Sequence, residues 1–355
     1  MSRIAIVTGA NGQDGSYLCE LLLEKGYRVF ACIRRSSQDT LGILRPILSR
    51  LDIRYIDMND AISLSNVVRE VDALLPAYER CEIYNLAAQS HVHVSFFVPD
   101  YTSECDALGL LRILECVRQS THRTKMRVYQ ASTSELYGDT TGYAMQSETT
   151  PFRPRSPYAT AKLYAYWISR NYRESYGMFI CNGILFNHES PRRGVEFITR
   201  KLTKGMADLH TGRRTDPVHV GNLDAKRDWG YAKDYVVAMW KMLQHETADD
   251  WVVATGQVHS VRDVVERIAT RLGISITWIR DENGLESAVD STGKVWVCQS
   301  AEFMRPNDVT YLCGDSSKIR AEIGWSISVT FEQLIDMMVD ADIVYTTAGS
   351  ISYTQ

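Results

Sequence analysis

The opening of the chain constrains the fold most, because a short apolar strand there runs through a glycine-rich turn into a helix. Residues 3–8 are mostly β-branched or small, residues 9–15 read GANGQDG, and an amphipathic stretch follows to Lys25. Glycines let the backbone approach a pyrophosphate, which the helix N-terminus attracts through its N–H groups and dipole. The turn predicts a dinucleotide site at Gly9, Asn11, Gly12, Gln13, Asp14 and Gly15.

The same alternation of strands and helices continues through the first half of the chain. We predict strands at 27–33, 53–57, 82–86, 127–131 and 178–185, with helices between them such as 64–75, 101–119 and 158–175. This pattern is typical of a Rossmann-type doubly wound parallel α/β sheet. Beyond Asn187 the pattern loosens, which indicates a smaller α/β substrate-binding domain. We expect the dinucleotide-binding domain at 1–186 and a mainly substrate-binding domain at 187–340, from which part of the chain can return to the first domain. Residues 341–355 would form a disordered or tag-like tail.

Composition excludes several partners. The 355 residues carry a formal net charge of −4, whereas nucleic-acid and anionic-membrane surfaces need a clustered basic excess. The eight cysteines form no C-x-x-C pair, which favours buried thiols in a reducing compartment. No signal peptide, membrane span or metal-ligand cluster is evident, so we expect a cytoplasmic protein with no metal, no membrane attachment and no nucleic-acid partner.

The ends of the next strands suggest the rest of a cofactor site. The second strand ends in Arg34, Arg35, Ser36 and Ser37, where NAD sites usually carry an acidic residue. Guanidiniums and hydroxyls suit a 2′-phosphate, so we predict NADP, although a solvated basic loop would look the same. Asp57 and Met58 would border the adenine. After the fourth strand comes a turn of mostly small residues: Leu86, Ala87, Ala88, Gln89 and Ser90. It would lie against the ribose and nicotinamide of the cofactor, although small residues could equally serve tight helix packing.

The strongest catalytic signal combines a strand end with a helix. Thr133, Ser134 and Glu135 end the fifth strand, and Tyr158 and Lys162 follow with i,i+4 spacing. That spacing puts phenol and ammonium on one helical face, so the ammonium can stabilise a phenolate that exchanges a proton with a sugar hydroxyl. Alone the Tyr–Lys pattern is weak, but it gains weight from the glycine turn.

Thr8 to Gly15, Thr133, Tyr158 and Lys162 together resemble the extended short-chain dehydrogenase/reductase family. Glu135 favours its dehydratase branch, because loss of water from a sugar needs a carboxylate to take the C5 proton, although an exposed loop carboxylate is the alternative. Residues 187–194, 221–230 and 305–306 resemble the corresponding segments of GDP-mannose 4,6-dehydratases, and the likeness extends to about Ile323.

The resemblance implies conversion of GDP-mannose to GDP-4-keto-6-deoxymannose through tightly bound NADP, for GDP-deoxysugar synthesis, by a homodimer or homotetramer. It implies catalytic roles for Thr133, Ser134, Glu135, Tyr158 and Lys162. Cofactor contacts would include Tyr101, Tyr158, Lys162, His188 and Arg193, and substrate contacts Ser90, Glu135, Asn187, Lys201, Arg227 and Arg305. Another nucleotide-sugar dehydratase, an epimerase of the same fold and a non-enzymatic NADP-sensing protein remain alternatives.

Overall fold

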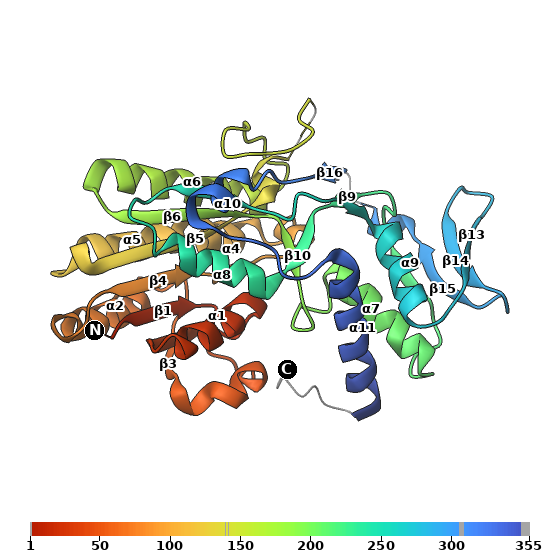
Figure 1. Ribbon diagram of the computed structural model, residues 1–355, viewed down its shortest axis with the longest axis horizontal. Helices are drawn as coiled ribbons and strands as arrows, with labels where there is room; N and C mark the ends of the chain where they lie inside the picture. Colours follow the sequence, from red (N-terminus) through yellow and green to blue (C-terminus); the bar gives the residue numbers. More distant parts are fainter. Residues whose placement is uncertain (1, 139, 141, 305–308, 349–355) are drawn as a thin grey trace. The chain divides into compact units, whose positions relative to one another are not determined.

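The computed structural model describes residues 2–138, 140, 142–304 and 309–348. The chain divides into two compact units, each built from separate segments. The larger unit comprises Met1–Phe186, Ala232–Val253 and Gly314–Ser326. The smaller unit comprises Asn187–Tyr231, Ala254–Cys313 and Ile327–Gln355. Figure 1 shows the elements of both in the colours of the sequence.

The larger unit is built on a seven-stranded sheet in the order β11-β6-β5-β4-β1-β2-β3. Every neighbouring pair in it is parallel. This confirms the predicted doubly wound parallel sheet, and the predicted strands lie within about two residues of the observed ones. The strands are β1 (Ile4–Thr8), β2 (Arg28–Ile33), β3 (Asp52–Tyr55), β4 (Cys81–Asn85), β5 (Met126–Thr133), β6 (Phe179–Leu185) and β11 (Asp250–Val253).

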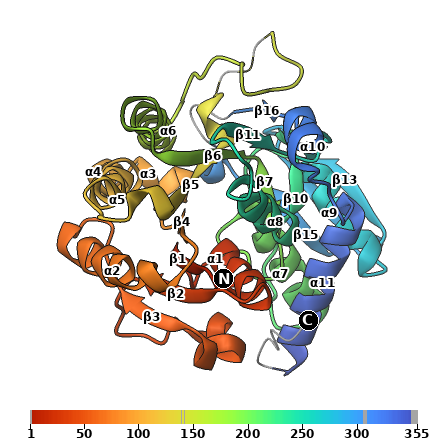
Figure 2. The ribbon, with the colours of Figure 1, turned by 60° about the vertical axis from the view of Figure 1, so that its left-hand side comes forward.

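Helices cover both faces of this sheet, with α1 and α8 on one side and α2, α5 and α6 on the other (Figure 2). Their ends follow local chemistry: the Ser156 side chain accepts the Ala159 N–H at the start of α6, and Gly177 ends it with a φ of 62°. In the part of the chain that the structure describes, no helix is both long and apolar enough to cross a membrane. The helices are α1 (Gln13–Glu24), α2 (Ala61–Leu74), α3 (Val92–Ser95), α4 (Pro99–Ser103), α5 (Gly109–Arg118), α6 (Pro157–Tyr176), α8 (Ala232–Met242) and α10 (Ser317–Ile323).

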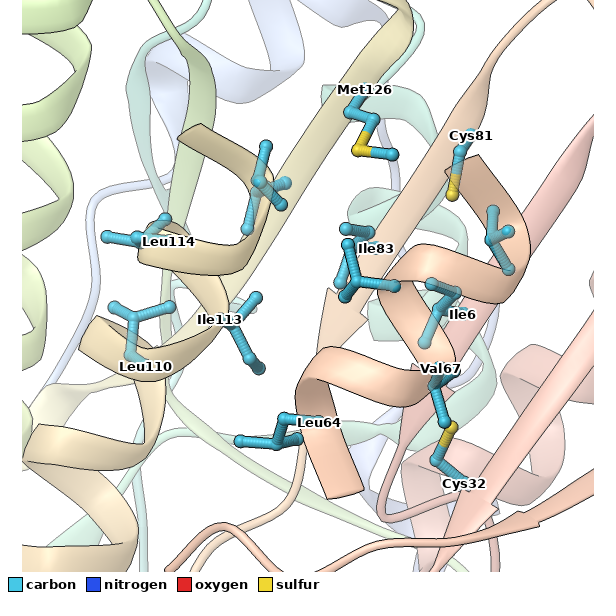
Figure 3. Packing of buried hydrophobic residues seen from close by; sticks show 14 of the residues in the cluster. Ile6, Cys32, Leu64, Val67, Cys81, Ile83, Leu110, Ile113, Leu114 and Met126 are labelled. Carbon is cyan, nitrogen blue, oxygen red and sulfur yellow. The ribbon is translucent and has the colours of Figure 1, made fainter. Parts of the chain in front are cut away.

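One hydrophobic core of this unit lies between the sheet and the helices α2, α5 and α6. Strand side chains such as Ile6 and Ile83 are almost fully buried there, as are Val71 and Leu114 on the helices. Close packing of this apolar layer holds the sheet against these helices. Figure 3 shows part of the layer, including Cys32, Leu64, Val67, Cys81, Leu110, Ile113 and Met126.

The smaller unit contains short strands where the sequence pattern looked irregular. Strands β13 (Ile276–Arg280), β14 (Glu286–Asp290), β15 (Val295–Gln299) and β8 (Val218–Val220) form one sheet. Glycines with φ near +80°, Gly284 and Gly293, make its two tight turns. Helices α7 (Ile198–His210), α9 (Val261–Arg271) and α11 (Phe331–Ala348) pack together. The other strands are β7 (Asn187–Glu189), β9 (Lys226–Arg227), β10 (Trp229–Tyr231), β12 (His259–Ser260) and β16 (Tyr311–Leu312).

The predicted tail is wrong for residues 341–348. Helix α11 continues through them to Ala348. Asp342 is fully buried there and pairs with Arg200 of α7, which is also buried. The prediction failed because the partner of Asp342 lies far away in the sequence, so its segment looked unattached.

Candidate active site

The candidate site begins where the strand order of the sheet reverses. Strand β1 is flanked by β2 on one side and by β4 on the other. The chain leaves β1 toward α1 and leaves β4 toward the helices of the opposite face. Open α/β sheets bind ligands at the carboxyl ends of the strands at such a point. The predicted turns at 9–15 and 86–90 follow these two strands.

A buried network ties the carboxyl ends of β1, β4 and β5 together. The Thr8 hydroxyl donates to Asn85 Oδ1 (2.8 Å) and accepts the backbone N–H groups of Leu86 and Ala87 (both 3.0 Å). Asn85 Nδ2 donates to Gln130 Oε1 (2.7 Å), whose amide donates to the Ala131 carbonyl (2.8 Å). Sequence reasoning missed Asn85 and Gln130, and polar residues at otherwise apolar strand positions were the available signal.

The glycines of the first turn have different structural roles. Gly9 has a φ of +66°, and a Cβ there would lie 3.0 Å from the Ala87 nitrogen. A Cβ on Gly15 would lie 2.2 Å from the Gly9 oxygen, so neither position accepts a side chain. Gly12 is exposed and N-caps α1, and its Cβ would meet only the Gly9 oxygen at 3.2 Å. That contact is tight but less severe than those at Gly9 and Gly15, so Gly12 is the least constrained of the three glycines by the fold itself.

The basic segment after β2 meets another predicted cofactor residue. Arg34 Nη1 donates to the Tyr101 hydroxyl of α4 (2.6 Å), so the structure brings these two together. Arg34, Arg35 and Ser37 are exposed. The Ser36 hydroxyl accepts the Gln38 N–H (3.1 Å), which shapes the loop. Exposed guanidiniums beside a phenol suit recognition of a phosphate group.

Three of the predicted cofactor residues, Gln89, Met58 and Asp57, have structural partners. Gln89 uses its side chain to accept the His91 N–H (2.7 Å) and to donate to Thr102 (3.3 Å), so it shapes the 86–90 turn. Met58 is buried and packs against Gly109. Asp57 accepts the Asn59 N–H (3.0 Å), and within the turn Ala87 and Ala88 are half-buried while Ser90 is exposed.

The predicted catalytic residues lie at the end of β5, on α6, and in the short 3₁₀ turn η5 (Ser134–Leu136) between them in sequence; both β5 and η5 pack against α6. Lys162 Nζ donates to the Ala131 carbonyl near the end of β5 (3.2 Å) and lies 5.9 Å from the centre of the Tyr158 ring. Thr133 Oγ1 accepts the Glu135 N–H (3.2 Å) and so keeps its own O–H as a donor. Ser134 is buried and Glu135 is half-buried. The end of β5 and the turn after it thus carry a hydroxyl and a carboxylate, and the helix α6 that packs against them carries a phenol and an ammonium.

Asp106 is a site residue that sequence reasoning missed. It lies 2 % exposed in η3 (Glu104–Leu108), a π-helical turn between α4 and α5. Burial raises the pKa of its carboxyl to about 6, although the charge of Lys162 and the Gln89 N–H act in the opposite direction. The sequence held a signal, because Asp106 occupies the same helical face as Leu110, Ile113 and Val117.

The remaining predicted residues belong to the smaller unit. Asn187 and His188 lie on β7. Arg193 pairs with Glu189 (3.2 Å) and its guanidinium lies over the Phe197 ring (3.6 Å).

Lys201 lies over the Phe303 ring (3.8 Å), and burial lowers the pKa of its ammonium, with the charge of Arg214 adding to the effect. Arg227 is on β9, and Arg305 lies outside the described residues. Arg193, Lys201 and Arg227 thus all belong to the smaller unit.

The GDP-mannose 4,6 dehydratase family model matches residues 6–338. The chain belongs to this family. It is 45% identical over 349 residues to the GDP-mannose 4,6 dehydratase of Homo sapiens, covering 96% of this chain and 91% of that protein. It is 46% identical to the Dictyostelium discoideum protein of the same name, with 98% of each chain covered.

Solved structures confirm the fold of this GDP-mannose 4,6-dehydratase family member. A dTDP-glucose 4,6-dehydratase of Streptomyces venezuelae with bound NAD superposes with a TM-score of 0.78 at 22% identity, covering 98% of both chains. RMD of Pseudomonas aeruginosa, complexed with NADPH, gives 0.71 at 19%, covering 96% of this chain and 99% of that one.

Proposed function

We propose that the protein converts GDP-mannose to GDP-4-keto-6-deoxymannose with loss of water, as a hydro-lyase that uses tightly bound NADP. Family membership supports the substrate. The observation that carries the reaction type is Glu135 in the turn η5 directly after β5: its backbone N–H donates to the Thr133 hydroxyl, and η5 packs against α6, the helix of Tyr158 and Lys162. An epimerase needs the phenol and the ammonium, but it has no use for a carboxylate that takes a C5 proton.

Each catalytic residue has a distinct role in the proposal. Tyr158 takes the proton from the C4 hydroxyl, assisted by the Lys162 ammonium and the Thr133 hydroxyl. A bound nicotinamide would supply hydride acceptance at C4 and hydride return at C6. Glu135 takes the C5 proton, which the adjacent 4-ketone makes acidic, and delivers it to the departing C6 hydroxyl; the proton held by Tyr158 restores the C5 hydrogen after hydride has reached C6. Ser134 assists the departure of the C6 hydroxyl as water.

The preference for NADP rests on the segment after β2. Arg34 and Arg35 are exposed there, and residues 34–37 contain no carboxylate to repel a 2′-phosphate. The Gly12 backbone would take the pyrophosphate, and Tyr101, His188 and Arg193 would complete the cofactor site. We assign the nucleotide sugar to Ser90, Asn187, Lys201, Arg227 and Arg305.

We also propose a cytoplasmic homodimer or homotetramer. All eight cysteines are free thiols, as expected in a reducing compartment.

The homo-oligomer is supported by three exposed aromatic side chains, Phe97, Tyr164 and Trp167, which are 72 %, 41 % and 53 % exposed. Phe97 follows α3, Tyr164 and Trp167 lie on α6, and these two helices pack together. Large exposed apolar side chains that gather on one face are typical of an interface, and a second copy would bury them. Sedimentation of the protein and of Trp167→Glu tests this, since a monomeric wild type would contradict it.

The reaction is tested by incubating the protein with GDP-mannose and a catalytic amount of NADP⁺. We expect a product that is lighter by one water, with no net accumulation of NADPH. Glu135→Gln should lower kcat by about 10² to 10⁴ without loss of bound NADP, since general acid–base groups contribute on that order. Turnover of a UDP- or dTDP-sugar in place of GDP-mannose would contradict the substrate.

Isomerisation of the sugar without loss of mass would favour an epimerase. Binding of NADP without turnover of any nucleotide sugar would favour a sensing protein.

A further inference from the structure

Glu189 is a buried carboxylate that the proposed reaction does not use. It is the last residue of β7 and is 2 % exposed. Burying a carboxylate is costly unless a cation and hydrogen-bond donors surround it, because the ion loses its hydration. Both kinds of partner are present, since Glu189 Oε2 accepts the Thr199 hydroxyl and lies 3.2 Å from Arg193 Nε. Glu189 therefore contacts a predicted cofactor residue directly.

The Arg193 side chain is held on two sides. Glu189 contacts its Nε, and the guanidinium carbon lies 3.6 Å from the centre of the Phe197 ring. A carboxylate on one side and an aromatic ring on the other restrict the rotamers of an arginine before any ligand arrives. The side chain is still 18 % exposed, and four of the five N–H donors of a guanidinium are on Nη1 and Nη2. An arginine held through Nε can thus present these donors to a phosphate.

Glu189 also joins two segments of the smaller unit that carry predicted ligand residues. Asn187 and His188 precede it on β7. Thr199, whose hydroxyl donates to Glu189, lies in the first turn of α7, and Lys201 follows it on the same helix. One carboxylate therefore ties the strand of Asn187 and His188 to the helix of Lys201.

We propose that Glu189 is a positioning residue: it fixes the Arg193 guanidinium, before any ligand binds, in the orientation that receives a phosphate of the dinucleotide cofactor. This inference rests on the proposed function, which supplies the cofactor contact of Arg193. Without the Glu189 charge, Arg193 loses one of the two contacts that orient it and gives up more side-chain freedom on binding. The loss should therefore appear in cofactor affinity rather than in the chemical step.

The test is a double-mutant cycle on NADP affinity, measured by fluorescence titration of protein freed of bound nucleotide. Glu189→Gln keeps the length of the side chain and an oxygen for the Thr199 hydroxyl, and it removes the charge. We expect it to raise the Kd for NADP about tenfold in the wild-type background, but less than about twofold when Arg193 is already replaced by alanine, because groups of one network are not additive. At saturating NADP and GDP-mannose, Glu189→Gln should lower kcat by less than about threefold.

Thr199→Val is the matched control, because it removes the other partner of the same carboxylate oxygen and leaves the charge beside Arg193. Its Kd for NADP should stay within about twofold of wild type. Equal increases in Kd from Glu189→Gln and Thr199→Val would show that Glu189 acts through the fold alone and would overturn the proposal. So would the same increase from Glu189→Gln in both Arg193 backgrounds, or a wild-type Kd in Arg193→Ala.

If Glu189→Gln fails to fold, Glu189→Asp takes its place in the cycle, because it keeps the charge but draws it back from Arg193. The same outcomes then decide. Cofactor binding is measured without turnover, so a wild type that binds NADP but converts no GDP-mannose would count against the proposed function alone.

Discussion

Removal of the Thr8 hydroxyl tests whether the strand-end network holds the cofactor turn. Thr8→Val keeps the shape and the β-branching of the side chain and removes the hydroxyl alone. The hydroxyl donates to Asn85 and accepts two backbone N–H groups, from Leu86 and Ala87. Thr8 is 1 % and Asn85 3 % exposed, so water cannot readily replace these bonds.

Three groups would lose a partner, of which one is buried and two are half-buried. At about 1 kcal/mol each, near the lower end of the range for buried unpaired groups, we expect a loss of about 3 kcal/mol in the free energy of unfolding. Urea denaturation measures it, and NADP affinity should fall as well because the 86–90 turn loosens. Thr8→Ser keeps the hydroxyl and is the matched control, expected to lose about 1 kcal/mol or less through its missing methyl. Equal stability of Thr8→Val and Thr8→Ser would refute the reasoning.

Three further predictions follow from individual contacts. Gly15→Ala should abolish NADP binding, measured by fluorescence titration, because the new Cβ would lie 2.2 Å from a backbone oxygen of the same turn; binding at wild-type affinity would contradict this. Asp342→Ala should lower the free energy of unfolding in urea by about 3–5 kcal/mol, because it leaves the Arg200 charge buried without its partner; a change below about 1 kcal/mol would show that the pair is not needed. Hydrogen bonds, chiefly from Arg118, lower the pKa of the Glu115 carboxyl to about 2. The ionised Glu115 therefore stabilises the fold above the ordinary pKa of a glutamate, and this stabilisation is lost as the pH falls toward 2. In acid titrations, Glu115→Gln should lose stability less steeply than wild type over that range.

Local signals predicted the larger unit well. Strand β1, the glycine turn and α1 form from residues adjacent in sequence, so periodicity and turn chemistry were sufficient to find them. The i,i+4 spacing of Tyr158 and Lys162 likewise fixes a shared helical face without knowledge of the fold.

Features that depend on distant partners were not predictable in this way. The bond between Thr8 and Asn85 exists because β1 and β4 are neighbours, which no local pattern states. The last turns of α11 are likewise held by the ion pair between Asp342 and Arg200, a residue far away in the sequence. Asp106 was missed because a charged residue in an amphipathic helix is usually solvent-facing, although its spacing from Leu110, Ile113 and Val117 indicated the buried face.

The most direct test of the central claim is to supply GDP-mannose that carries deuterium at C4 and to locate the label in the product. Internal transfer through a cofactor that never leaves predicts deuterium at C6 of the 4-keto-6-deoxy product, seen by mass spectrometry and NMR, even when unlabelled NADPH is present in solution. Loss of the label to solvent or to free NADPH, or its return to C4 of an unchanged hexose, would contradict the account.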